Sequence, residues 1–461
     1  MKSIKAIILA AAAVTLTAMT GVGIIGDRES QDKEYHYFED PIDCSGCHWD
    51  RFERFSVSQH SKGFSGDFFQ AQFYQLVLPS LEFDEKVADT HEGCIGCHSP
   101  SAFLSGDMIP ERRISPDNHW NPAEENRTRA DRGIFCDFCH TLDRFEHEVP
   151  FNHDYISHAT AEIDPKRADL EFPWSPHHET ETSEIFEDPM ICATCHNELN
   201  PYGIWVKATE MEYTESVYFD RGIVCQDCHM QPMGGKPAKM GWPREENHDH
   251  WFGGGFSEFV EGAAGVYFQE SAGKDIYDSV SPGQEIDFDI LVKALATGHM
   301  FPTGSVEERD VWLHVSLNNA KGEEILHIPV PVNEDDPDDQ YFITSNARVA
   351  YPSHSKLTEA IERDGLPEGD RIYHSAFIDS EGNMTYAQWF CVKEIENRLD
   401  PLEERMEHYR FPVPDHLEQG TYYLTAQLNY RRMPDPLADY LKIARRPVLE
   451  VSRDVREIEV Q

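Results

Sequence analysis

A five-residue pattern, Cys-x-x-Cys-His, occurs five times between residues 44 and 229 of this chain. Two thiols at this spacing can add to the two vinyl groups of one porphyrin, and the histidine that follows can then bind the iron from below. The pattern therefore predicts five covalently attached haem c groups. The expected thioether residues are Cys44, Cys47, Cys94, Cys97, Cys136, Cys139, Cys192, Cys195, Cys225 and Cys228, and the expected proximal ligands are His48, His98, His140, His196 and His229.

Disulfides and zinc are the alternatives for paired cysteines. Disulfide frameworks are typical of small secreted domains, and zinc ribbons place their cysteine pairs roughly 15 to 20 residues apart. Here the successive patterns begin 50, 42, 56 and 33 residues apart. Neither alternative explains a histidine after every pair in a chain with only 23 histidines among 461 residues. We therefore favour haem.

The charge of the chain restricts its partners. The formal net charge is −43, which would repel nucleic acid and anionic lipid surfaces. We expect no nucleic-acid partner, and the same charge favours solubility in salt or contact with basic proteins. The eleventh cysteine, Cys391, lies among apolar residues and is expected to be an unreactive thiol.

The first 25 residues have the features of a targeting segment. Lys2 and Lys5 precede an uncharged, mostly apolar run from Ala6 to Ile25, which is typical of a signal peptide. The run is also long enough to remain as an N-terminal anchor. We therefore expect an exported, periplasmic protein, with membrane anchoring or an outer-surface position left open.

Residues 26–255 contain all five patterns and few long periodic runs. Short helices are expected at Trp49–Phe55, Gly66–Val77 and Glu210–Phe219. Five haems in this segment leave about 45 residues for each, fewer than an independent domain of at least about 50 requires. The haems should therefore share one core and lie close enough for electrons to pass between them.

Residues 256–461 show a different periodicity. Apolar and polar residues alternate in Ile286–Val292, Val311–Leu317 and Tyr422–Tyr430, which predicts an antiparallel, immunoglobulin-like β-sandwich. A short helical insertion is expected at Leu357–Gly365. The predicted fold class is mixed: a haem-packed, largely irregular and short-helical domain, followed by the sandwich.

Each iron also needs a ligand on its far side unless that position is left open for a substrate. Histidine is the favoured ligand, because the chain up to His299 holds more histidines than five irons need. We expect His60, His91, His178, His250 and His299, with His36, His119, His153 and His158 in reserve. Methionine is the competing ligand, and because Met/His ligation raises the potential, a mostly bis-histidine set predicts low-potential haems.

His299 lies in a segment unlike those of the other candidates. It stands in Thr297-Gly-His299-Met-Phe-Pro-Thr-Gly304, between two predicted strands, where glycine and proline favour a fixed turn. As a haem ligand it would attach the sandwich to the haem domain, and a structural hydrogen bond within the loop is the alternative.

The chain resembles a known family at these residues. Cys44-Ser-Gly-Cys47-His48 followed by Ser58-Gln-His60 is similar to the start of multihaem cytochromes related to the tetrahaem electron acceptor of hydroxylamine oxidoreductase. Gly133-Ile-Phe-Cys136, Arg221-Gly-Ile-Val-Cys225 and Gly298–Gly304 resemble segments of exported multihaem cytochromes of metal-reducing and sulfate-reducing bacteria. The resemblance implies electron transfer, bis-histidine ligation and an appended sandwich, but it names neither donor nor acceptor.

Three functions follow from these observations. The first is an exported pentahaem electron carrier of an anaerobic respiratory chain, with redox proteins as partners and with a membrane or outer-surface respiratory complex as a further associate. The second is an oxidoreductase of the nitrite or hydroxylamine type with one open haem. The usual Cys-x-x-Cys-Lys of pentahaem nitrite reductases is absent from the sequence, so an enzyme is the less favoured alternative. The third is a filament-forming or structural cytochrome.

Overall fold

The computed structural model describes residues 38–113, 128–157, 165–245, 247–255, 259–269, 278–345, 348–350 and 360–461. Residues 35–461 form one compact unit. The predicted targeting segment and three of the reserve histidines, His36, His119 and His158, lie outside the described residues. Within the described ranges no helix is both long and apolar enough to cross a membrane.

The part of the chain that carries the Cys-x-x-Cys-His patterns is built from short helices, as expected. The helices predicted at Trp49–Phe55, Gly66–Val77 and Glu210–Phe219 are confirmed, the second continuing into a π-helical turn at Phe73–Val77 and the third as two separate helices. The helices are α1 (Pro41–Ser45), α2 (Trp49–Val57), α3 (Asp67–Gln72), α4 (Leu78–Ser80), α5 (Thr90–His98), α6 (Pro100–Leu104), α7 (Cys136–Cys139), α8 (Met190–His196), α9 (Thr209–Thr214), α10 (Val217–Asp220) and α11 (Cys225–His229).

Three small strand pairs connect these helices. They are β1 (Leu142–Arg144) with β2 (Ile156–Ser157), β3 (Lys166–Ala168) with β4 (Thr180–Thr182), and β5 (Asn197–Leu199) with β6 (Trp205–Ala208). Each pair is only two to four residues long, too short to be stable without packing against other elements.

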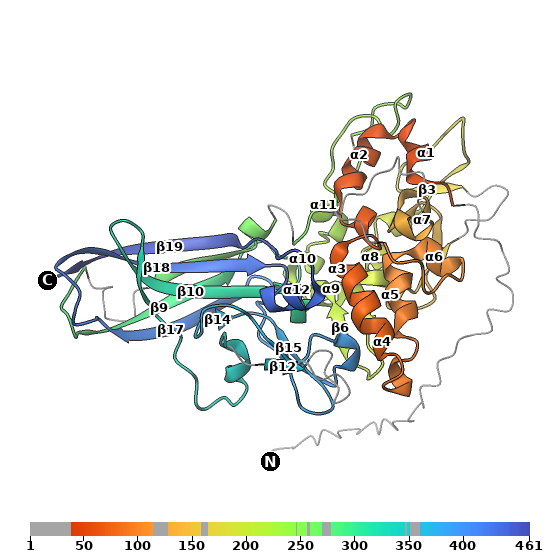
Figure 1. Cartoon of the computed structure of the whole chain (residues 1–461). Helices are drawn as coiled ribbons and strands as arrows, with labels where there is room; N and C mark the ends of the chain where they lie inside the picture. Colours follow the sequence, from red (N-terminus) through yellow and green to blue (C-terminus); the bar gives the residue numbers. More distant parts are fainter. Residues whose placement is uncertain are drawn as a thin grey trace, which may run out of the picture. The chain divides into compact units, whose positions relative to one another are not determined.

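Long antiparallel strands dominate the C-terminal part of the chain, and Figure 1 shows them on the side of the unit away from most of the helices. The three predicted alternating runs lie in β9, β10 and β18. Burial alternates along β9 and through part of β18, because successive side chains point to opposite faces of a strand, whereas most of β10 is buried on both faces. One sheet has the order β11-β10-β18-β19-β8, with β14 also pairing β10, and a second has the order β17-β9-β7. The strands are β7 (Ala264–Gln269), β8 (Ser279–Val280), β9 (Glu285–Ala294), β10 (Asp310–Asn319), β11 (Glu324–His327), β14 (Arg371–Ile372), β17 (Glu404–Pro412), β18 (Gly420–Arg431) and β19 (Leu449–Val460).

The remaining elements are two short hairpins and a helix. They are β12 (Arg348–Ala350) with β13 (Ala360–Glu362), β15 (Ser375–Ile378) with β16 (Lys393–Glu396), and α12 (Asp435–Leu441). The helix predicted at Leu357–Gly365 is wrong for Ala360–Glu362, because these residues pair antiparallel with β12. Backbone pairing with the preceding strand has overridden the local preference there.

Two large apolar cores and two small ones result. Side chains from both large sheets, among them Val266, Ile290, Leu313 and Leu428, form one cluster. A second cluster joins side chains of α3 and α5 with Trp389, Phe390 and Leu437 from far along the chain. This second core therefore contains residues from both sides of the division expected near residue 255, which stays a prediction.

Candidate cofactor-binding site

Every Cys-x-x-Cys-His pattern lies in or at the end of a short helix. α5, α7, α8 and α11 each contain both cysteines of one pattern, and α1 contains the first cysteine of the Cys44 pattern. Residues three and four apart lie on the same face of a helix. The two thiols and the histidine of each pattern are therefore on one side, as attachment to a single porphyrin requires.

Four of the five proximal histidines face a second histidine ring. The ring centroids are 6.5 Å apart for His48 and His178, 6.3 Å for His60 and His196, 6.1 Å for His140 and His250, and 6.3 Å for His229 and His299. A bond from a metal ion to an imidazole nitrogen is about 2 Å long, so two rings that share one ion have centroids roughly 6 Å apart. Each pair thus leaves room for one iron between its rings.

Hydrogen bonds fix the orientation of most of these rings. The Nδ1 atoms of His48, His98, His140 and His229 lie 2.7, 2.9, 2.5 and 2.5 Å from backbone carbonyl oxygens of Pro237, Gly63, Arg167 and Gly253. A carbonyl only accepts, so Nδ1 carries the proton and the lone pair is on Nε2. The Nδ1 atoms of His178, His250 and His299 also face carbonyl oxygens, at 2.9 to 3.0 Å. Nε2 is then the atom free to bind a metal.

The protonation of the rings suits ligation. Burial lowers the pKa of His60 to about 3, with further lowering by His196 and His229, and burial likewise lowers the pKa of His250 to about 3. Burial also lowers the pKa of His98 and of His196 to about 4. Burial disfavours the imidazolium form, and the neutral ring is the form that binds a metal.

Contacts between cysteines show which patterns are neighbours. Cys136 raises the pKa of the Cys44 thiol, Cys225 raises that of Cys192, and Cys195 lowers that of Cys97, so the two thiols of each pair lie next to each other. Cys139 contributes to the raised pKa of Cys195, after the effects of Cys97 and burial. The first pattern therefore adjoins the third, and the second and fifth adjoin the fourth, which is also near the third. Sequence order does not give this arrangement.

His98 has a different environment from the other proximal histidines. Among the described residues no histidine ring is paired with it, and Phe69 stacks on it with centroids 4.1 Å apart. The charges of Lys207 and Glu198 also act on its pKa, after burial and the Gly63 carbonyl. Lys207 forms an ion pair with Glu198, and its Nζ also donates to Gln388 at 3.0 Å.

Two buried carboxyl groups lie near Lys207. Glu307 and Glu308 are 4% and 0% exposed, and burial raises the pKa of Glu308 to about 7. Gln72 donates to one oxygen of Glu308 at 2.6 Å. Within the described residues, the other oxygen of Glu308 and both oxygens of Glu307 have no hydrogen-bond partner.

The fifth predicted distal residue, His91, is not part of a ring pair among the described residues. It lies in α5, seven residues before His98, so the two side chains are two turns apart on the same helix face. His91 therefore cannot lie opposite His98 across one iron, and its assignment to another iron stays a prediction. The reserve residue His153 packs against Gly96 and is, after Cys195, a further cause of the lowered pKa of Cys97.

Two further histidines of this part of the chain contact carboxylates instead of another histidine. His147 pairs with Asp154 at 2.8 Å, and His248 with Asp169 at 3.2 Å. Sequence reasoning did not identify Phe69, Lys207, Glu307 or Glu308, because neither a stacking ring nor a buried charge has a sequence motif of its own.

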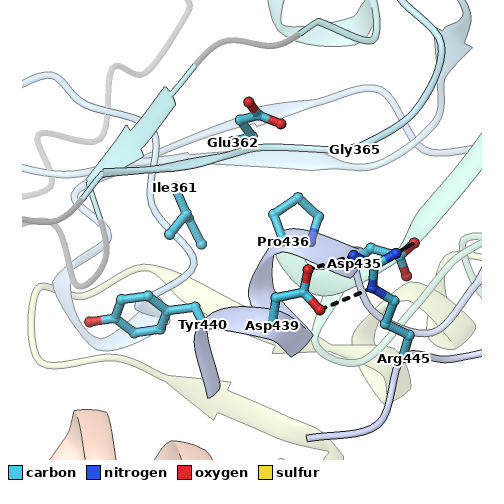
Figure 2. A pocket seen from close by; sticks show the side chains of 8 residues that line it. All are labelled: Ile361, Glu362, Gly365, Asp435, Pro436, Asp439, Tyr440 and Arg445. Carbon is cyan, nitrogen blue, oxygen red and sulfur yellow. Dashed lines mark hydrogen bonds and ion pairs between the residues drawn. The ribbon is translucent and has the colours of Figure 1, made fainter. Parts of the chain in front are cut away.

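Two surface cavities lie apart from the ring pairs. One of about 490 Å³ is lined by residues of β13 and α12 and by Arg445, which binds Asp439 at 2.6 Å (Figure 2). The other, of about 380 Å³, lies beside α8 and is lined by side chains that include Met190, Trp205 and Glu210. No lining residue of either cavity is a cysteine or histidine of the patterns.

Comparison with known proteins gives one informative match. No protein-family model matches the chain, and no curated relative matches it. The structure is similar to that of a penta-haem cytochrome c552 from Thermochromatium tepidum, with a TM-score of 0.56 and 16% identity over 91% of this chain and 99% of that one. The sporulation control protein Spo0M from Bacillus subtilis also matches, with a TM-score of 0.17 and 12% identity over 43% of this chain and 50% of that one. At these identities the first match supports a shared fold, and the second carries no argument.

Proposed function

We propose that this protein is an exported multihaem c-type cytochrome that carries electrons in a respiratory chain through five covalently attached haems. The observation that carries the proposal is the set of four histidine ring pairs with centroids 6.1 to 6.5 Å apart, each including the histidine of a Cys-x-x-Cys-His pattern. The fold shared with a penta-haem cytochrome supports it.

The haems would supply one-electron chemistry, and the chain's own residues position them. The cysteines of each pattern would hold one porphyrin, the two histidines of each of the four ring pairs would be its iron ligands, and the backbone carbonyls keep Nδ1 protonated. Paired imidazoles without methionine favour low potentials. The neighbouring patterns define a route from the first to the third, fourth and fifth haem, with the second joining at the fourth. Redox proteins would serve as donor and acceptor, and a membrane or outer-surface complex is a further candidate partner.

A second function, substrate reduction or oxidation at one haem, is favoured by the environment of His98. The described residues place no histidine opposite it, while Lys207 and the acidic pair Glu307 and Glu308 are buried nearby. An open haem beside groups that can hold protons could act on a small nitrogen compound such as nitrite or hydroxylamine. The filament-forming alternative would instead supply the missing ligand from another subunit.

Electron paramagnetic resonance of the oxidised holoprotein separates these functions. A carrier should show only low-spin ferric haem, whereas an enzyme should show one high-spin haem in five whose signal shifts when nitrite or hydroxylamine is added. A low-spin fifth haem that becomes high-spin on dilution to monomers would favour the filament.

His299→Ala tests the ligand assignment itself. Removing this ring should convert the haem held by His229 to the high-spin form, because that haem would lose its second histidine. His147→Ala is the matched control, since His147 is exposed and bonds only Asp154 among the described contacts. An unchanged spectrum in His299→Ala would exclude His299 as a ligand.

A further inference from the structure

Three side chains of the larger C-terminal sheet converge away from the Cys-x-x-Cys-His patterns. His314 lies in β10, His327 ends β11, and Asp370 directly precedes β14. Each offers one donor atom, and these atoms all lie within 4.8 Å of one another. His327 Nε2 is 2.7 Å from Asp370 Oδ1, and His314 Nδ1 is 2.9 Å from Asp370 Oδ2.

The backbone around this cluster is fixed on all three sides. β10 and β11 pair antiparallel, with Ser316 opposite His327, and the two imidazole rings are nearly parallel, 4.9 Å apart at 11°. The Gly369 N–H donates to the Thr344 carbonyl at 2.9 Å, and the Asp370 N–H donates to the Thr344 hydroxyl at 2.8 Å. Gly369 has φ +103 and packs against Pro329, a conformation that favours glycine. The donors are therefore held in place before any ligand binds.

A fourth residue occupies the position expected of an outer-sphere partner. His314 faces Asp370 through Nδ1 and faces Glu324 through Nε2, at 2.9 Å. A histidine that binds a metal through one nitrogen usually donates its other N–H to a carboxylate. Asp370 is 1% exposed, whereas His314 and His327 are 18% and 22% exposed, so an ion could reach the two rings from solvent.

We propose that His314 Nδ1, His327 Nε2 and the Asp370 carboxylate bind one divalent first-row transition-metal ion, with Glu324 orienting His314 and water completing the coordination. Two imidazoles and one carboxylate are a donor set that suits zinc, iron, nickel or copper in the divalent state. Donor atoms bound to one such ion at about 2 Å lie roughly 3 Å apart, and each imidazole nitrogen is 2.7 to 2.9 Å from an oxygen of Asp370. The N–H protons that now point at Asp370 leave to solvent when the ion binds. The inference is independent of the haem-binding residues.

The competing explanation is a hydrogen-bonded network without a metal. His408 provides the comparison within the same chain, since its Nδ1 lies 2.8 Å from Asp289 and its Nε2 lies 3.4 Å from Asp287. It also stands between two carboxylates, both on the neighbouring strand β9, but it has no second histidine among the clustered residues. If carboxylates beside a histidine were enough, both places would bind zinc equally.

Zinc binding to the full-length holoprotein tests the proposal. After treatment with a chelator, titration calorimetry with zinc chloride and equilibrium dialysis with elemental analysis should give one tightly bound zinc ion per chain. His327→Ala should weaken binding at least 100-fold, and Glu324→Gln about 10- to 100-fold, the usual effect of losing an outer-sphere partner. His408→Ala should bind as the unaltered protein does.

Three results would overturn the proposal: no stoichiometric zinc in the unaltered protein, unchanged binding in His327→Ala, or an equal loss in His408→Ala. Because His327 and Glu324 are partly exposed, their variants are expected to fold. Circular dichroism and the haem absorbance spectrum of each variant check this directly.

Discussion

The proximal histidines illustrate how backbone atoms complete a site at the scale of single residues. In four of the five, the Nδ1 proton goes to a carbonyl oxygen, of Pro237, Gly63, Arg167 or Gly253, and these acceptors belong to different segments of the chain, Arg167 to β3. A carbonyl acceptor is present at every position of a chain, so it leaves no sequence signature. Only the path of the backbone selects which carbonyl each ring meets.

Glu308 allows a prediction at this scale. Burial raises its pKa from about 4.5 to about 7, so between these values the folded protein binds a proton that the unfolded chain has released. Stability should therefore fall as the pH rises from about 4.5 to 7, by a few kcal/mol at most, since one pKa unit corresponds to about 1.4 kcal/mol. Glu308→Gln should flatten this part of the pH profile of thermal unfolding.

The control for this experiment is Glu418→Gln, because Glu418 is exposed on the surface. It should leave the slope between pH 4.5 and 7 unchanged. If Glu308→Gln retains the full slope, the carboxyl group of Glu308 is not the source of the pH dependence.

At the scale of elements, the loop that carries His299 is held to the helical part by one buried guanidinium. Arg398 donates to Glu212 of α9 at 2.7 Å, to Glu396 of β16 at 2.7 Å and to the Pro302 carbonyl at 3.2 Å. Thr303 also donates to Glu212, at 2.8 Å. The Gly-His-Met-Phe-Pro-Thr-Gly segment is thus positioned by partners from two other segments of the chain.

Arg398→Met tests this attachment. Arg398 is 6% exposed, and removing one member of a buried ion pair typically costs about 3–5 kcal/mol because the remaining charges lose their partner. The variant should show a lower midpoint of guanidinium denaturation, and the haem bound through His229 should become partly high-spin. Arg410→Met is the matched control, because Arg410 is 54% exposed and pairs with Asp287 at 3.0 Å. Equal effects in both variants would contradict the role of Arg398.

At the scale of the whole molecule, the net charge of −43 bears on how redox partners approach. An acidic surface attracts cations and repels anions over about 8 Å at physiological ionic strength. The reduced protein should therefore transfer electrons to a cationic acceptor such as hexaammineruthenium(III) at least about 10-fold faster than to an anionic complex of similar driving force.

Stopped-flow oxidation at several salt concentrations measures this preference. The ratio of the two rates should fall towards one as salt rises, because screening removes the long-range term. A ratio that does not depend on salt would mean that the acidic residues are far from the haem edges where electrons leave.

The sequence by itself predicted the attachment sites, and its periodicities placed three of the long strands. The Cys-x-x-Cys-His pattern lies within about one helical turn, so local geometry places its three side chains together, and the alternating runs likewise give β9, β10 and β18. Local patterns also favoured His60, His178, His250 and His299, which the structure brings opposite a proximal ring.

Only the tertiary structure decided which residues meet. His48 and His178, or His60 and His196, are far apart in sequence, and among the described residues His98 has a phenylalanine ring beside it but no histidine ring. The same holds for Arg398 with Glu212, and for His314 and His327 with Asp370. Contacts of this kind depend on how strands and loops pack, and packing is a property of the whole chain that no short stretch of sequence encodes.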